Sequence, residues 1–177
     1  MTITHWNRIA SPVGELLLTA HEDELREIWF VNGRHPVSIP AGARPGGELL
    51  AEVERQLGEY FGGQRRTFDL PLAPQGTDFQ RRVWKALLDV PFGTTVAYSD
   101  IATAVGTPAA VRAVGAANGR NPIPIVIPCH RIIGKDGSLT GYGGGLPVKR
   151  FLLRLEGATT GQQLTFGERS ALPGISL

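Results

Sequence analysis

The segment 121–131 most constrains how this chain of 177 residues can fold. It reads NPIPIVIPCHR and contains three prolines. Each proline fixes φ and lacks a backbone donor, so the run suits neither a helix interior nor a central strand. We therefore expect a rigid, extended support that holds Cys129, the only cysteine of the chain, in a fixed place.

Cys129 allows two interpretations. A lone cysteine in an apolar run often behaves as a small core residue, whereas His130 and Arg131 directly after it favour a reactive thiol, because a thiolate needs a base or positive charge nearby. Adjacent side chains on an extended segment point to opposite faces, so Cys129 and His130 need a turn or a bridging water to interact. A third group should orient the base, and Glu156 and Asn121 are the candidates.

The composition excludes several other kinds of site. One cysteine cannot form an intramolecular disulfide. The four histidines are scattered without ligand spacing to Cys129, so we expect no metal. The glycine-rich run 140–145 lacks the Gly-Lys-Ser/Thr ending of a phosphate-binding loop, and we expect no cofactor. No membrane span or signal peptide is apparent, which favours a cytoplasmic location without a membrane partner.

Charge differs between the two halves of the chain. Residues 1–77 carry seven Lys/Arg against ten Asp/Glu, whereas residues 78–156 carry ten against five. The half that contains the cysteine is therefore the basic one. An excess of positive charge favours a polyanionic partner such as a nucleic acid, although many basic surfaces are merely solvated.

The patterns predict an α+β protein. The first half indicates an antiparallel sheet with a helix, in an N-terminal scaffold domain over 1–74. The second half indicates a mainly helical domain over 75–157, followed by a loose tail over 158–177. The expected strands are 6–9, 15–20, 25–31 and a short one at 66–70, with a loop at 34–47; the expected helices are 48–61, 78–90 (capped by Thr77), 99–105, 108–119 and 147–156.

The two short helices around Gly106 form a helix-turn-helix pattern, for which an ordinary helical corner is the alternative. Ser99 is expected to cap the first helix, and Thr107 the second, with Pro108 at its first position. Arg112 is the only charged residue of the second helix. Its small neighbours would let the backbone approach DNA closely, with Arg112 as a probe. The alternative for Arg112 is an ion pair with Asp100 or Glu156. In the last helix, Lys149 is expected outward and Phe151 inward.

The segment 121–131 resembles the active-site signature of the O6-alkylguanine-DNA alkyltransferases, the methylated-DNA–protein-cysteine methyltransferases. The resemblance covers about residues 77–157 and includes TDFQRRVW at 77–84, RAVG at 112–115, YGGG at 142–145 and LLRLE at 152–156. It implies repair of O6-alkylguanine in duplex DNA. Whether O4-alkylthymine is also repaired stays open. The resemblance further implies a monomer and leaves cooperative assembly on DNA open.

The resemblance also implies roles for individual residues. Cys129 would accept the alkyl group, His130 would act as the base through water, Glu156 would orient His130, and Asn121 would brace the turn. Arg112 would replace the flipped base in the stack, and Tyr98 would help to rotate the nucleotide. Ala110, Val111 and Gly115 would contact the minor groove. The guanine pocket would comprise Pro124, Ile132, Tyr142, Gly143 and Gly144.

Two departures from the family pattern bear on recognition. Val111 stands where alanine is frequent, which alters the fit to the groove, and Gly143 stands where some members have serine. No second cysteine is present to remove the alkyl group, so we expect one turnover per molecule. Two other function classes stay open: a cysteine hydrolase that uses Cys129, His130 and Glu156, and a lesion-binding protein without catalysis.

Overall fold

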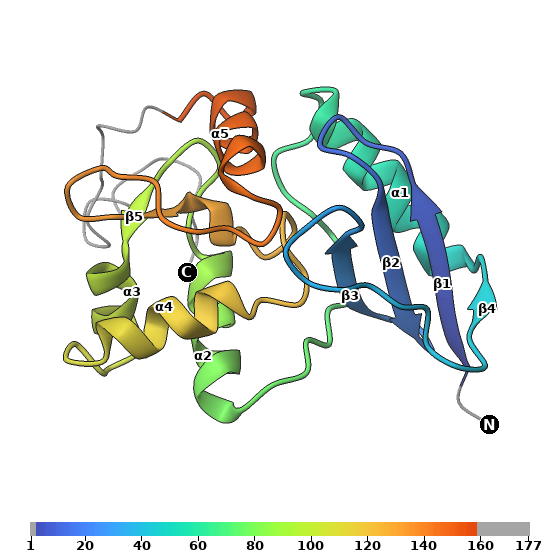
Figure 1. Ribbon diagram of the computed structural model, residues 1–177, viewed down its shortest axis with the longest axis horizontal. Coiled ribbons are helices and arrows are strands. Elements are labelled where there is room, and N and C mark those ends of the chain that lie inside the picture. The colour runs from blue at the N-terminus through green and yellow to red at the C-terminus, as the bar shows by residue number, and fades with distance from the viewer. Residues whose placement is uncertain (1–2, 159–177) are drawn as a thin grey trace.

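The computed structural model describes residues 3–158, which form two parts that lie side by side (Figure 1). A small sheet with one helix makes up the N-terminal part, and a group of short helices makes up the C-terminal part. The α+β class is therefore confirmed. The predicted tail, apart from Ala158, lies outside the described residues. No helix within residues 3–158 is long and apolar enough to cross a membrane.

The sheet has four strands in the order β3-β2-β1-β4. The predicted antiparallel meander is confirmed in β1 (Thr4–Ile9), β2 (Leu16–His21) and β3 (Glu24–Phe30). The expectation of a purely antiparallel sheet is wrong, because β4 (Arg44–Pro45) pairs parallel with β1 inside the predicted loop. A strand of two residues that contains a proline has no alternation that a sequence pattern could reveal.

Helix α1 (Glu48–Phe61) packs against the sheet with the predicted bounds. Its buried face follows the helical period through Leu50, Val53, Leu57 and Tyr60. The strand predicted at 66–70 is absent, and only an isolated bridge joins Leu72 to Leu25. Prolines on both sides of this bridge, at 71 and 74, remove the donors that a longer ladder needs.

Four helices form most of the C-terminal part: α2 (Asp78–Leu88), α3 (Tyr98–Ala104), α4 (Val111–Gly119) and α5 (Leu146–Leu155). Thr77 caps α2 as predicted, in a reciprocal capping box with Gln80. Trp84 of α2 donates from Nε1 to the Ala117 carbonyl at 2.8 Å and so ties α2 to α4. Two short strands, β5 (Val96–Ala97) and β6 (Ile132–Ile133), pair in parallel beside them.

The helix-turn-helix pair is present, but both predicted helix starts are wrong. Helix α3 begins at Tyr98, because Asp100 accepts a hydrogen bond from the Ala97 backbone at 2.9 Å and places the cap before Ser99. Helix α4 begins only at Val111, because a turn in which Ala110 N donates to the Thr107 carbonyl occupies the residues before it.

The expected orientation of two side chains in α5 is also wrong. Lys149 is fully buried, and Phe151 is 37% exposed. The buried face of the helix passes through Lys149, Leu152 and Leu153 instead. The lysine lies inside because its ammonium group finds backbone carbonyls to bond there, which the apolar periodicity cannot reveal.

The two parts meet along β3. Its Ile28 N–H donates to the Pro122 carbonyl at 2.8 Å, and Arg34 N donates to the Gly143 carbonyl at 3.1 Å. The rings of Phe30 and Tyr142 contact edge to face with centroids 5.6 Å apart. The segment that carries Cys129 is thus held between the sheet and the helices.

Candidate active site

Asn121 closes the loop that leads to the cysteine. Its Nδ2 donates to the Ile127 carbonyl at 2.8 Å, and its Oδ1 accepts from the Ile123 N–H at 3.0 Å. Within this loop Ile125 has a φ of 73°, in the left-handed region that β-branched residues rarely occupy. The buried amide of Asn121, together with the hydrogen bond from the Ile127 N–H to the Ile123 carbonyl (2.9 Å), therefore holds a strained loop closed immediately before Cys129.

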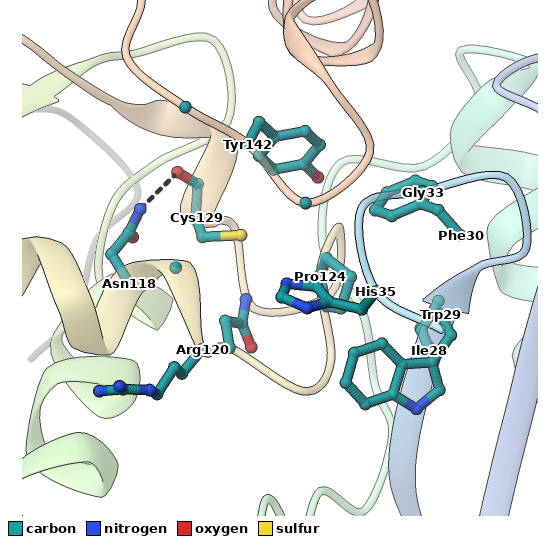
Figure 2. A pocket seen from close by; sticks show the side chains of 14 residues that line it. Ile28, Trp29, Phe30, Gly33, His35, Asn118, Arg120, Pro124, Cys129 and Tyr142 are labelled. Atoms are coloured by element: carbon teal, nitrogen blue, oxygen red, sulfur yellow. Dashed lines mark hydrogen bonds between the residues drawn. The ribbon is translucent and has the colours of Figure 1, made fainter. Parts of the chain in front are cut away.

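A 3₁₀ turn over Cys129–Arg131 follows the loop. It supplies the change of direction that two neighbouring side chains need in order to serve one site. The side chain of His130 is fully buried, and Cys129 is 4% exposed. The Cys129 sulfur points into a cavity between the two parts of the molecule (Figure 2).

Glu156 follows α5 and accepts hydrogen bonds from every side. Oε1 accepts from His130 Nε2 at 2.7 Å, from Tyr60 Oη at 2.7 Å and from Arg131 Nη2 at 2.9 Å. Oε2 accepts from Arg131 Nε at 2.9 Å and from the Gly93 N–H at 3.2 Å. Because Nε2 of His130 is engaged by this carboxylate, only Nδ1 can exchange a proton with another group, and it has no partner among residues 3–158.

The environment fixes the charge states of this network. Burial alone would raise the pKa of the Glu156 carboxyl, but its interaction with His130 and the charge and hydrogen bonds of Arg131 hold it well below its usual range. Burial lowers the pKa of His130, although Glu156 opposes the shift. It follows that His130 is neutral and Glu156 is ionised, because Arg131 already balances the charge of Glu156. His130 is therefore ready to accept a proton at Nδ1.

The thiol itself is buried among groups that favour its ionised form. Burial raises the pKa of Cys129, and hydrogen bonding from Asn121 and the positive charge of Lys149 offset part of this rise. Lys149 Nζ donates to the carbonyls of Ile132 (2.5 Å) and Thr140 (3.3 Å). Burial lowers its pKa to about 8, so it is mostly charged at neutral pH. The apolar period of the last helix predicted Lys149 on the surface, so its positive charge near the sulfur was not expected.

The cavity in front of the sulfur measures about 270 Å³ and opens between the parts of the molecule (Figure 2). Its apolar and aromatic walls, with a few polar groups, are typical of a site for a flat organic ligand. Three polar atoms on or beside it have no hydrogen-bond partner among the described residues, namely Asn118 Oδ1, His130 Nδ1 and Tyr142 Oη. The lining residues are Ile28, Trp29, Phe30, Gly33, His35, Asn118, Gly119, Arg120, Asn121, Pro124, Cys129, Gly141, Tyr142 and Gly143.

Comparison with known proteins gives one consistent result. Two family models match successive segments of the chain. The model of the ribonuclease-like domain of 6-O-methylguanine DNA methyltransferase matches residues 4–74, and the model of its DNA-binding domain matches residues 78–158. The methylated-DNA–protein-cysteine methyltransferase of Methanosarcina barkeri is 51% identical over 152 residues, which span 86% of this chain and 96% of that protein.

Solved structures agree. The O6-methylguanine methyltransferase of Mycobacterium tuberculosis superposes with a TM-score of 0.81 at 45% identity, over 88% of this chain and 93% of that one. A structure of the M. tuberculosis protein in complex with DNA gives 0.80 at 46%, over 86% and 92%. The chain belongs to the 6-O-methylguanine DNA methyltransferase family. The predicted family and enzyme class, a DNA-repair methyltransferase that transfers methyl groups to cysteine, are confirmed.

The second group of predicted site residues lies on the helix-turn-helix of this methyltransferase. Arg112 is exposed and has no ion pair within the part of the chain that the structure describes. The two acids considered as its partners are engaged elsewhere, Asp100 with the Ala97 backbone and Glu156 with Arg131. Its neighbours on this surface are the half-buried Ala110 and the exposed Val111.

Tyr98 joins this surface to the loop over the cavity. Its hydroxyl shares a hydrogen bond with Thr140 Oγ1, and its ring lies beside Gly115, where an added Cβ would come within 3.8 Å. A Cβ at position 115 would therefore make an ordinary van der Waals contact with the ring and would not displace it. Among the residues predicted for the pocket, Pro124, Tyr142 and Gly143 line the cavity.

Two other predicted pocket residues of the methyltransferase lie outside the lining. The carbonyl of Ile132 accepts from Lys149, and Gly144 packs against the Phe30 ring, 3.1 Å from where its Cβ would stand. In their place the N-terminal part contributes Trp29, Phe30 and His35. No local pattern of residues predicts these three side chains at the site, because they reach it through contacts between distant segments.

Proposed function

We propose that this methyltransferase repairs O6-alkylguanine in duplex DNA by transferring the alkyl group irreversibly to Cys129. One observation carries the assignment to this residue: the only sulfhydryl of the chain faces a cavity of suitable size, beside a neutral histidine held by an ionised carboxylate. A nucleophilic cysteine with an oriented base is the arrangement that such a transfer needs.

The step begins when a water carries the Cys129 proton to His130 Nδ1. Glu156 holds Nε2 and stabilises the imidazolium that forms. The thiolate attacks the alkyl carbon, a C–S bond forms, the C–O6 bond breaks, and its electron pair stays on O6. The proton held by His130 returns through water to the guanine, so atoms and charge balance. The product is a thioether, and no other cysteine exists to regenerate the thiol. Each molecule therefore acts once.

The lesion must leave the base stack before the sulfur can reach it, at a cost of a few kcal/mol. We assign the opening of the duplex to the helix-turn-helix surface, with α4 in the minor groove. Because Arg112 is exposed and has no ion pair among residues 3–158, it is free to enter the stack, and Tyr98 lies between that surface and the loop over the cavity. Ala110, Val111 and Gly115 would let the helix approach the groove closely.

Several finer assignments complete the proposal. Residues 1–74 act as a scaffold domain, and 75–157 as the DNA-binding and active-site domain. The backbone of Gly143 would recognise guanine, and the carbonyl of Cys129 its amino group, since Gly144 and Ile132 lie outside the cavity lining and Lys149 already binds the Ile132 carbonyl. The protein acts as a monomer in the cytoplasm, without a metal or cofactor.

Intact-mass spectrometry tests the proposal directly. The full chain is incubated with equimolar duplex that contains O6-methylguanine, and peptide mapping then locates any modification. We expect one methyl group on Cys129, restored guanine in the duplex, and no reaction in a second round with fresh duplex. The Cys129→Ala variant should bind the duplex and stay unmodified. An unmodified wild-type protein would refute the proposal, and restored guanine over many rounds would favour a hydrolase.

A further inference from the structure

The Glu156 carboxylate receives one of its donors from the opposite part of the molecule. Tyr60 lies near the end of α1, 96 residues earlier in the chain, and its Oη donates to Glu156 Oε1 at 2.7 Å. Both side chains are buried. The oxygen that Tyr60 binds is the same one that accepts from His130 Nε2.

The tyrosine ring is fixed by its surroundings, so the hydroxyl has a defined position. Three aromatic rings contact it: Phe61 and Phe92 edge to face, and Phe68 at a tilt, with centroids 5.4 to 6.2 Å away. Phe61 and Phe68 belong to the N-terminal part, whereas Phe92 leads from α2 toward the Gly93 N–H that bonds Glu156 Oε2. The aromatic cluster thus sets the hydroxyl and the carboxylate in one rigid unit.

We propose that Tyr60 is a positioning residue for alkyl transfer, through which the N-terminal part sets the orientation and proton affinity of the His130–Glu156 pair. This inference rests on the proposed function and assigns the N-terminal part a role in the chemistry beyond that of a scaffold. Tyr60 is not among the residues that line the cavity, and it acts through Glu156.

The direction of its effect follows from the shared oxygen. Tyr60 Oη and His130 Nε2 share Oε1 with Arg131 Nη2 and compete for the same negative charge, so the Tyr60 hydrogen bond weakens the attraction of Glu156 for the His130 proton. Without the hydroxyl, Glu156 would stabilise the imidazolium more strongly and would raise the pKa of His130. The other charges near this pair stay in place: Arg131 faces both Tyr60 and His130, and Lys149 faces His130 and Cys129.

The Tyr60→Phe variant removes only the hydroxyl and keeps the ring contacts. Its matched control is Thr19→Val, which removes another buried hydroxyl of the N-terminal part, bonded to Glu27 Oε2 at 3.0 Å and remote from Glu156. Each full-length variant is compared with wild type below its unfolding transition. Titration to the endpoint with methylated duplex gives the fraction of active molecules, so that rates refer to active protein alone.

Two rates are measured against pH: methyl transfer from duplex, and alkylation of Cys129 by iodoacetamide, which needs no DNA. For Tyr60→Phe we expect the acid limb of both profiles to move up by about 0.5 to 1 pH unit, because losing a hydrogen bond to a charged group shifts a linked pKa by this order. The transfer rate at the plateau should fall about tenfold, which corresponds to 1.4 kcal/mol, because Glu156 loses a hydrogen bond that fixes its orientation toward His130. Thr19→Val should leave both profiles in place.

The outcomes separate the two hypotheses. Tyr60→Phe profiles that match wild type, or that match Thr19→Val, would overturn the role of Tyr60, because a purely structural residue changes the active fraction and leaves the acid limb in place. A shifted iodoacetamide profile in a protein that takes no methyl group from DNA would support Tyr60 as a positioning residue and refute the proposed function alone.

Discussion

The segment around Cys129 and the surface of α4 differ in how far their side chains are restrained. Asn121, His130 and Glu156 are buried, and each makes hydrogen bonds within the protein. Arg112 is exposed and has no ion pair within residues 3–158, and Val111 beside it is also exposed. On the proposed function, the two regions would divide the labour: the fixed interior would perform the chemistry, and the free surface would open the DNA.

This division predicts that substitutions of the buried residues lower both stability and reactivity, on duplex and on the free base alike. Changes on α4 should leave stability unchanged and should matter only when the lesion lies in a duplex. Each of the following changes tests one side of the comparison.

The largest effect is expected for Glu156→Gln. It leaves Arg131 buried without its counter-ion, which typically costs about 3–5 kcal/mol of unfolding free energy. His130 also loses the charge that stabilises its protonated form, so transfer should slow by about a hundredfold or more. Urea unfolding and single-turnover kinetics would measure the two losses. Glu52→Gln, in an exposed pair with Arg55, is the control and should change neither quantity.

Asn121→Ala should have the next largest effect. It removes both hydrogen bonds that close the strained loop at Ile125, and a buried group left without its partner costs about 1–3 kcal/mol. Transfer should slow about tenfold on duplex and on the free base alike, because the sulfur is displaced in both cases. Unchanged urea unfolding would contradict the assignment of this loop as a strained element.

The pH dependence of the wild type offers a smaller and sharper test. Burial lowers the pKa of His130 below its ordinary value of 6.5, so the imidazole should still be mostly neutral at that pH. The transfer rate on saturating duplex should therefore fall by less than half between pH 7.5 and pH 6.5, and more steeply only below. A rate already halved at pH 6.5 would mean that His130 titrates like an exposed histidine.

The smallest effect is expected for Val111→Ala. The side chain is 37% exposed, and such surface changes usually stay within about 0.5 kcal/mol. A smaller residue should let α4 approach the groove more closely. Duplex binding should then tighten by about twofold, a change that stays within about 0.5 kcal/mol. Fluorescence anisotropy with an unmodified duplex would detect this change. Weaker binding would show that the valine itself contacts DNA.

The sequence predicted these two regions unequally. The long signature at 121–131 and the helical periods of α1 and α2 sufficed to predict the family, the α+β class and the cysteine. Lys149, in contrast, was predicted on the surface, because the spacing of apolar residues does not show that backbone carbonyls inside the protein can bind an ammonium group. Tyr60 lies in the helix predicted over 48–61, but its hydrogen bond to Glu156 depends on how the two parts of the molecule meet.

The walls of the cavity show the same limit. His35 and Trp29 come from the N-terminal part, whose sequence offered no cluster of candidate catalytic groups. Contacts between segments so far apart leave no local pattern of residues. The predicted starts of α3 and α4 were wrong for a related reason. The Asp100 side chain and the turn at 107–110 decide where these helices begin, and Ser99 and Thr107 do not.

The most direct test of the division of labour is the ratio of two transfer rates, on duplex that contains O6-methylguanine and on the free O6-methylguanine base. For Arg112→Ala the ratio should fall about tenfold, since the variant loses only the group that offsets part of the cost of base flipping. For Asn121→Ala the ratio should equal that of wild type, although both rates are lower. If Arg112→Ala slows both reactions equally, the separation of chemistry from DNA opening is wrong.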